Sequence, residues 1–174
     1  IIRGPVTYEL SEKEEYTLED SDIIETGMDS NATITWPDKS LTRLGPKTRI
    51  TIEKMYASSN YDDIQIAYSL EQGKVWNTII RSLVWDSYFE VHLPRESIVA
   101  WVRGTTFEVN LENHYIRAIS HNTLLTQKKQ SVELFPGEMV DSENILILKG
   151  KEWLDKTWND WNTSADFIYE SLRK

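Results

Sequence analysis

Cysteine is absent from the 174-residue chain, which excludes disulfide scaffolds, thiolate zinc sites, iron–sulfur clusters and cysteine nucleophiles. No apolar run approaches the roughly 20 residues that a membrane-spanning helix needs, and the chain does not open with the apolar segment of a signal peptide. The first residue is Ile1 rather than methionine. We therefore expect a processed or truncated piece whose natural N-terminus lies upstream.

Basic residues are also scarce. Lys and Arg number 19 against 28 Asp and Glu, so the net charge is −9. Affinity for nucleic acids rests on clustered Lys and Arg, and this charge argues against a nucleic-acid partner. Hydrophobic residues make up 40% of the chain and charged residues 27%, as in ordinary globular proteins. The length predicts one domain with at most a short appendage.

Catalytic signatures are missing as well. The histidines at positions 92, 114 and 121 lack the spacing of a helical zinc site, and neither a G-x-S-x-G elbow nor a glycine-rich nucleotide loop is present. We predict a non-catalytic protein with no cofactor and no bound metal. The acid-rich segment between Glu9 and Glu25 is expected to be a solvated face. A calcium site in this segment is the alternative, although the order of an EF-hand loop is lacking.

The first 149 residues alternate apolar and polar positions with the period of a β-strand. Ile64, Ile66, Tyr68 and Leu70 show this pattern, and glycine and proline separate the segments that carry it. Many short strands with turn residues between them predict an all-β fold, either a multi-strand antiparallel sandwich or a β-solenoid-like body.

The last 25 residues, 150–174, read differently, and we predict that they form a C-terminal amphipathic α-helix. Beyond Gly150 there is no further glycine or proline, and the apolar residues step by three and four positions. The predicted apolar stripe consists of Leu154, Trp158, Trp161, Ala165, Ile168 and Leu172. The charged residues fall on the remaining faces of the helix, namely Asp155, Lys156, Asp160, Asp166 and Glu170.

Tryptophan is the one abundant residue of note, with seven copies. In the helical tail the stripe has two interpretations, docking on the β body or binding a partner, which includes a second copy of the chain. The residues assigned to partner binding are Trp153, Trp158, Trp161 and Ile168. In the β body the tryptophans are expected to pack within strands, with exposed stacking platforms for sugars as the alternative; they are Trp36, Trp76, Trp85 and Trp101.

Five blocks of the β body, spread between about residues 4 and 145, resemble the FecR-like domain family. They are residues 22–34 with D-I-I-E-T-G and S-N-A-T-I, residues 38–50 with D-K-S-L-T-R-L-G-P-K-T-R-I, residues 70–75 with L-E-Q-G-K-V, residues 102–109 with V-R-G-T-T-F-E-V, and residues 132–138 with V-E-L-F-P-G-E. The family has glycine where this chain has Lys39, so the turn there is expected to differ. The membrane helix and the cytoplasmic domain of the family's transmembrane regulators are not part of this sequence.

The resemblance implies an extracytoplasmic module of a bacterial envelope protein that recognises a protein partner, in the periplasm or at the cell surface. Its anchor would be an N-terminal segment outside this sequence. The motif residues are expected to build the scaffold; they are Gly27, Asp38, Arg103, Gly104, Thr105, Phe107 and Gly137. We expect Arg103 to pair with Asp38, since a charge beside a buried strand needs a partner. The alternatives are a surface component that self-associates through the tail and a glycan-binding module.

Overall fold

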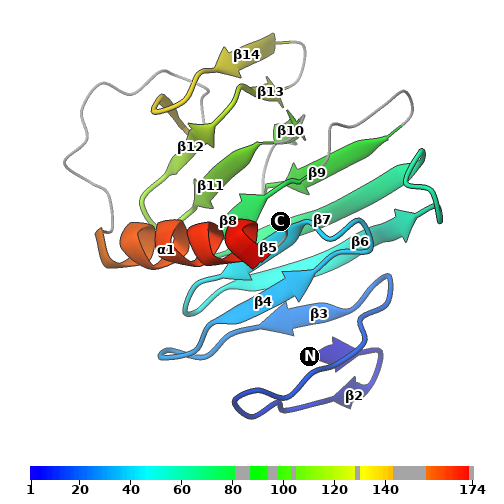
Figure 1. Ribbon diagram of the computed structural model, residues 1–174. Coiled ribbons are helices and arrows are strands. Elements are labelled where there is room, and N and C mark those ends of the chain that lie inside the picture. The colour runs from blue at the N-terminus through cyan, green and yellow to red at the C-terminus, as the bar shows by residue number, and fades with distance from the viewer. Residues whose placement is uncertain (81–86, 94–97, 103–104, 128–129, 143–155, 173–174) are drawn as a thin grey trace.

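The computed structural model describes residues 1–80, 87–93, 98–102, 105–127, 130–142 and 156–172, which form fifteen strands and one helix (Figure 1). Sheet A has the order β2-β1-β3-β6-β7-β9, and sheet B has the order β15-β12-β11-β8-β5-β4. Sheet C has the order β10-β13-β14. The strands of sheet A are β1 Ile2–Arg3, β2 Val6–Thr7, β3 Ile23–Glu25, β6 Arg49–Ala57, β7 Ile64–Gln72 and β9 Tyr88–His92. Those of sheet B are β4 Ala32–Thr35, β5 Leu41–Leu44, β8 Lys74–Thr78, β11 Thr106–Asn110, β12 Tyr115–Ser120 and β15 Met139–Asp141. Sheet C contains β10 Ile98–Val102, β13 Thr123–Gln127 and β14 Gln130–Leu134.

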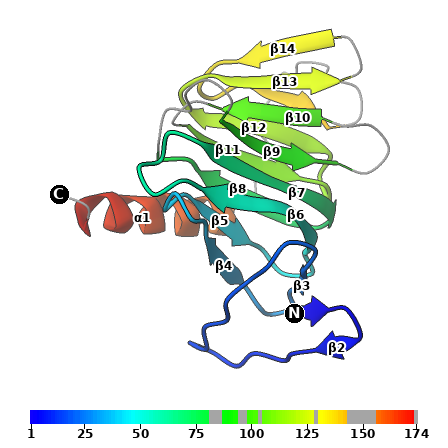
Figure 2. The ribbon, with the colours of Figure 1, turned by 90° about the vertical axis from the view of Figure 1, so that its right-hand side faces the viewer.

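Sheets A and B pack face to face as a sandwich, and sheet C extends sheet A because β10 lies beside β9 (Figure 2). The strand pairs are antiparallel, apart from β7 and β9, which run parallel. This arrangement confirms the all-β class and, of the two predicted architectures, selects the sandwich. The helix α1, Lys156–Leu172, follows the sandwich, as predicted. The predicted boundary between residues 149 and 150 lies outside the described residues and stays a prediction.

The core fills the space between the two sheets with the alternating apolar side chains. Phe107 and Val109 are 0% and 1% exposed, which confirms that both point into the core. At its centre the Trp36 ring stacks on Tyr68 with centroids 5.7 Å apart, and Phe89 meets both rings edge-on. Burial raises the pKa of the Tyr68 hydroxyl, which donates a 2.8 Å hydrogen bond to Asn77 Oδ1.

Three of the motif blocks meet at one corner of the sandwich. Thr26 Oγ1 donates to the Gly45 carbonyl over 2.6 Å and accepts from the Thr48 N–H over 2.8 Å. Thr48 Oγ1 in turn accepts from the Lys74 N–H and donates to the Lys74 carbonyl, both over 3.1 Å. Two threonine hydroxyls therefore satisfy backbone groups of turns that are far apart in the sequence.

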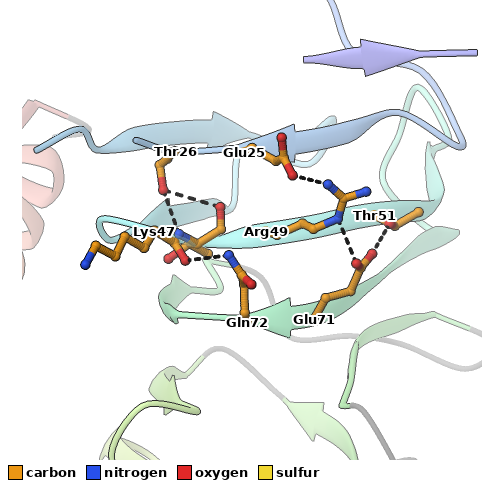
Figure 3. Close-up of polar contacts among 8 residues, drawn as sticks. Glu25, Thr26, Lys47, Arg49, Thr51, Glu71 and Gln72 are labelled. Carbon is orange, nitrogen blue, oxygen red and sulfur yellow. Dashed lines mark hydrogen bonds and ion pairs between the residues drawn. The ribbon is translucent and has the colours of Figure 1, made fainter. Parts of the chain in front are cut away.

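The outer face of sheet A next to this corner carries an ion-pair cluster (Figure 3). Arg49 bonds Glu25 on one side and, through Nε over 2.8 Å, Glu71 on the other. Thr51 Oγ1 also donates to Glu71, over 2.6 Å. These pairs tie β3, β6 and β7 together across their exposed surface, where each ion pair adds at most about 1 kcal/mol.

Gly73 is constrained by the same corner. It has a φ of +84°, and a Cβ added there would lie 2.4 Å from Thr48 Oγ1 and 2.6 Å from Thr48 Cα. Gly137 has a φ of +87° with nothing within 4 Å of an added Cβ. The two glycines thus share their backbone requirement and differ in available space.

We expect Gly73→Ala to lower the free energy of unfolding by about 2 to 4 kcal/mol, because both backbone strain and overlap with Thr48 must be accommodated. Gly137→Ala is the control and should cost only the left-handed strain, about 1 kcal/mol. Urea unfolding followed by tryptophan fluorescence measures both. Equal losses in the two variants would show that the Thr48 contact does not matter.

Lys39 occupies the turn between β4 and β5, at the position where the resemblance implies glycine. Its φ is +74°, the left-handed region, and its N–H donates to the Trp36 carbonyl over 2.9 Å. Asp38 holds the turn from the side, since its carboxylate accepts from the Ser40 N–H over 2.9 Å and from the Ser40 hydroxyl over 2.6 Å. The lysine is therefore accommodated by backbone strain at a position that suits glycine.

We expect Lys39→Gly to raise the free energy of unfolding by about 1 kcal/mol relative to Lys39→Ala, because only glycine adopts this φ without strain. Comparing the two variants cancels the loss of the lysine side chain, and thermal unfolding measures the difference. A Lys39→Gly variant no more stable than Lys39→Ala would contradict the strain.

Asp22 departs from the expectation of a solvated acidic segment. Its side chain is 0% exposed and accepts hydrogen bonds from Arg3 Nε over 2.7 Å and Nη2 over 2.6 Å, and from the Glu19 N–H over 2.9 Å. The bonds to the Arg3 guanidinium hold the pKa of the Asp22 carboxyl below its usual range. This pair fastens β1 to the start of its neighbour β3 in sheet A.

We expect Asp22→Asn to lower the free energy of unfolding by about 2 kcal/mol at pH 7. Because the pKa of Asp22 is lower in the folded chain, its stabilisation is present above the unfolded pKa near 4 and is lost as the pH falls through the folded value. The gap between wild type and Asp22→Asn should therefore narrow below about pH 4. Asp20→Asn, whose carboxylate is 46% exposed, is the control and should show little gap at any pH. Urea unfolding from pH 2 to 7 measures both, and a pH-independent gap for Asp22→Asn would contradict the ionic pairing.

Candidate partner-binding surface

The helix α1 lies across the outer face of sheet B, the face that points away from the core (Figures 1 and 2). Four adjacent strands present charged and aromatic side chains there in one row. Register places Arg43 opposite Trp76, Trp76 opposite Glu108, and Glu108 opposite Arg117. All four are between 1% and 8% exposed, so α1 covers a buried polar row.

The row is held together by contacts across the strands. Arg117 Nη2 donates to Glu108 Oε2 over 2.8 Å, and its guanidinium carbon lies 5.7 Å from the Trp76 ring centroid. The Tyr115 hydroxyl donates to the other Glu108 oxygen over 2.6 Å. Burial, followed by the negative charge of Glu108, raises the pKa of Tyr115. Glu108 thus accepts from two side chains, as a buried carboxylate requires.

Asp166 makes the central contact between α1 and the sheet. Its Oδ1 accepts from Arg43 Nη1 over 2.5 Å and from Thr78 Oγ1 over 2.8 Å, and its Oδ2 accepts from Trp76 Nε1 over 2.8 Å. Its side chain is 15% exposed. Charge-assisted bonds of this kind are stronger and more directional than neutral ones.

Two further contacts lie about two turns earlier along the helix. Asn159 Oδ1 accepts from Arg117 Nη2 over 2.8 Å. The Lys74 ammonium lies 5.2 Å from the Trp158 ring centroid, a cation–π geometry. Of the two interpretations of the tail, docking on the β body is therefore what the chain shows.

The four residues predicted for partner binding have different locations. Trp158 is 5% exposed and buried against the sheet, while Trp161 is 41% exposed and lies beside it with centroids 5.4 Å apart. Trp153 and the side chain of Ile168 lie outside the described part of the chain. A partner contact at these residues stays a prediction, and Trp161 is the one whose ring is accessible for it.

The structure places Asp166 against the sheet. The sequence put this residue on the helix faces outside the apolar stripe and left open whether the stripe docks or binds a partner. In the structure Asp166 is bonded to sheet B, Asn162 is 0% exposed, and of the stripe Trp158 is buried while Trp161 is 41% exposed. The outer face of sheet B is polar, so it draws the polar side of the helix toward it. The sequence feature that could have indicated a polar outer face is Arg43, an arginine within the short strand L-T-R-L.

The predicted scaffold residues that the structure describes lie in the sandwich. Thr105 is 1% exposed and its hydroxyl donates to the Ser120 carbonyl, and Gly137 supplies a positive φ at the turn after β14. An added Cβ at Gly27 would lie 3.2 Å from Ser30 Oγ, the end of an exposed side chain that can shift, and Gly27 is not among the positive-φ glycines. Arg103 and Gly104 lie outside the described residues, and so does the expected pair between Arg103 and Asp38.

The tryptophans of the β body and His92, where the structure describes them, are not arranged to bind a ligand. Trp36 and Trp76 are each 1% exposed and offer no face to a sugar. Trp85 and the side chain of Trp101 lie outside the described residues. His92 contacts Glu53 through Nδ1 over 2.6 Å and Glu90 through Nε2 over 3.2 Å. Within the described ranges no group of three or more His, Asp or Glu residues is arranged to hold a metal ion. In the same ranges no helix is long and apolar enough to cross a membrane.

Comparison with known proteins places this fold. The chain is similar to two crystal structures of a putative anti-sigma factor from Parabacteroides distasonis ATCC 8503, with TM-scores of 0.59 and 0.58 and identities of 19% and 18%. The match covers 79% of this chain in both cases and 63% and 62% of those chains, so the chain spans less than two thirds of their length. No curated protein matches. A family model described as FecR protein matches residues 22–125, more than half of the chain, and the protein therefore belongs to the FecR family.

Proposed function

We propose that the chain is a non-catalytic interaction and sensor module of a bacterial envelope regulator, located outside the cytoplasm. The observation that carries this proposal is the FecR family match over residues 22–125, which runs from β3 into β13 and includes four of the five motif blocks. The likeness to putative anti-sigma factor structures supports a regulatory setting at the level of the fold.

A binding role suits the polar residues better than a catalytic one. The buried charges of the outer face of sheet B are bonded to other side chains of the same chain, Arg43 to Asp166 and Arg117 to Glu108. A catalytic acid, base or nucleophile must instead reach a substrate. Groups already committed to internal pairs position the surface and do not perform chemistry on a ligand.

The surface that supports recognition is the outward side of α1. Trp161 exposes 41% of its surface while its neighbour Trp158 anchors the helix to sheet B. An accessible tryptophan held by a packed neighbour loses little conformational entropy on binding, which is why tryptophan is enriched among the residues that dominate interfaces. We place the first contact with a protein partner at this position.

In the native bacterium, the parent protein should carry a photocrosslinking amino acid at position 161 in place of Trp161. We expect irradiation to give one dominant crosslinked protein from the envelope. To test the location, protease is added to spheroplasts, and we expect it to digest the domain. The matched control carries the same amino acid at Asn60, an exposed position in the β6–β7 turn, and should give little crosslinking.

Three outcomes separate the alternatives. Protection from protease in spheroplasts would overturn the location outside the cytoplasm. Equal crosslinking at positions 161 and 60 would overturn a specific surface on α1. A crosslinked product with twice the mass of the parent protein would instead favour the assembly role, in which exposed Trp161 contacts a second copy.

A further inference from the structure

The donors that bind Asp166 form a receptor for one carboxylate. Arg43 lies on β5, and Trp76 and Thr78 lie on the adjacent strand β8. The guanidinium, the indole N–H and the hydroxyl converge on the two oxygens over 2.5 to 2.8 Å. Arg43 and Trp76 are opposite each other in the register, so the sheet itself sets the spacing of the donors.

This receptor belongs to a body whose core is complete without α1. The members of the buried hydrophobic cluster lie between Ile24 and Val140, on the strands and the turns between them, and Trp158 is not among them. The donors therefore sit on central strands held from the opposite face of sheet B. A site on such strands keeps its geometry whichever helix supplies the carboxylate.

The contacts of α1 with this face favour specificity over stability. Among the helix side chains described, from 157 to 166, the buried ones are Trp158 and Asn162. Asn162 Oδ1 and Arg117 Nε, both buried, have no hydrogen-bond partner within the described ranges. A buried ion pair contributes little net free energy after desolvation, and unsatisfied polar atoms subtract from it. The net free energy gained when α1 docks on this face is therefore small, so another helix can replace α1.

The charge of the outer face of sheet B indicates which side chains a replacing helix must carry. Without α1 the face presents Arg43, Lys74 and Arg117 against Glu108 and, on the edge strand β15, Asp141. Three positive and two negative charges give a local charge of +1 on a chain of net charge −9. A basic patch on an acidic protein orients an acidic partner and disfavours others.

We propose that the outer face of sheet B is a binding site for an acidic helix of a partner protein, and that α1 is the intramolecular occupant which this helix displaces. The partner helix places one carboxylate between Arg43, Trp76 and Thr78. It carries an aromatic residue eight positions earlier, where Trp158 meets Lys74. The inference rests on the proposed role as a protein-interaction module and names the partner's chemistry.

The test uses the full chain and a fluorescently labelled peptide of residues 156–172 as a stand-in for the acidic helix. We expect the peptide to bind the full-length Asp166→Asn variant at least tenfold more tightly than the wild-type chain by fluorescence anisotropy, because wild-type α1 blocks the site. Full-length Asp160→Asn, which removes an exposed acid from the same helix, is the control and should bind as weakly as wild type.

Two further variants test carboxylate recognition itself. A labelled peptide carrying Asp166→Asn should bind the Asp166→Asn chain at least tenfold more weakly than the wild-type peptide does. Adding Arg43→Gln to the Asp166→Asn chain should weaken binding of the wild-type peptide by a similar factor. Cooperative thermal unfolding of each chain confirms that the sandwich is folded.

Equal affinity of the wild-type and Asp166→Asn chains for the peptide, or the absence of binding to a folded Asp166→Asn chain, overturns the proposal. So does a dimer of either chain in light scattering without peptide, since the face would then be covered by a second copy. If the peptide fails while position 161 still crosslinks an envelope protein, the sheet B site is wrong and the interaction role stands. If the peptide binds as expected but the parent protein is protected from protease, the envelope role falls and the site stands.

Discussion

Sheet B is covered on both faces, and the two faces require opposite chemistry. One face contributes Leu44, Val75 and Phe107 to an apolar core, whereas the other buries the row from Arg43 to Arg117. Because strands alternate their side chains, one set of short strands supplies both faces at once. A buried charge must be met by a polar partner, so the element that covers the second face has to bring a carboxylate to Arg43, and α1 does so with Asp166.

Residue patterns predict the first face well and the second poorly. Alternation placed Phe107 and Val109 in the core, and the turn residues around Gly137 marked a real turn. Asp166 escaped prediction because its partners lie 88 to 123 residues away, and no local rule links such positions. Helical periodicity identifies the most hydrophobic face of α1. That face is the packed one only if the surface beneath the helix is apolar, whereas the outer face of sheet B is polar. Lys39 was not predicted to hold a left-handed conformation, since tertiary context overrides residue preference there.

The motif blocks that reveal the family supply both the scaffold and part of the surface under α1, since Arg43 and Lys74 lie in two of these blocks and contact Asp166 and Trp158. Thr26, Thr48 and Gly73 build a corner of the sandwich, and their requirements are steric and backbone-directed. The family match ends at residue 125, before β14, β15 and α1. The family match therefore spans β3 to β12 and part of β13, while the covering helix belongs to the part of the chain beyond it. This division fits a common fold that is adapted to different partners through an appended segment.

The parallel pairing of β7 with β9 has a consequence for the order in which the chain folds. The strand between them, β8, belongs to the opposite sheet, so the chain crosses the core from sheet A to sheet B and back. The contact between Gln65 and Tyr88 closes a loop that contains β8, a strand of the far sheet. Neither sheet can be completed alone, and the entropy of closing this loop is offset only when both layers meet. The sandwich should therefore form in one concerted transition governed by non-local contacts, with slow folding as the kinetic signature.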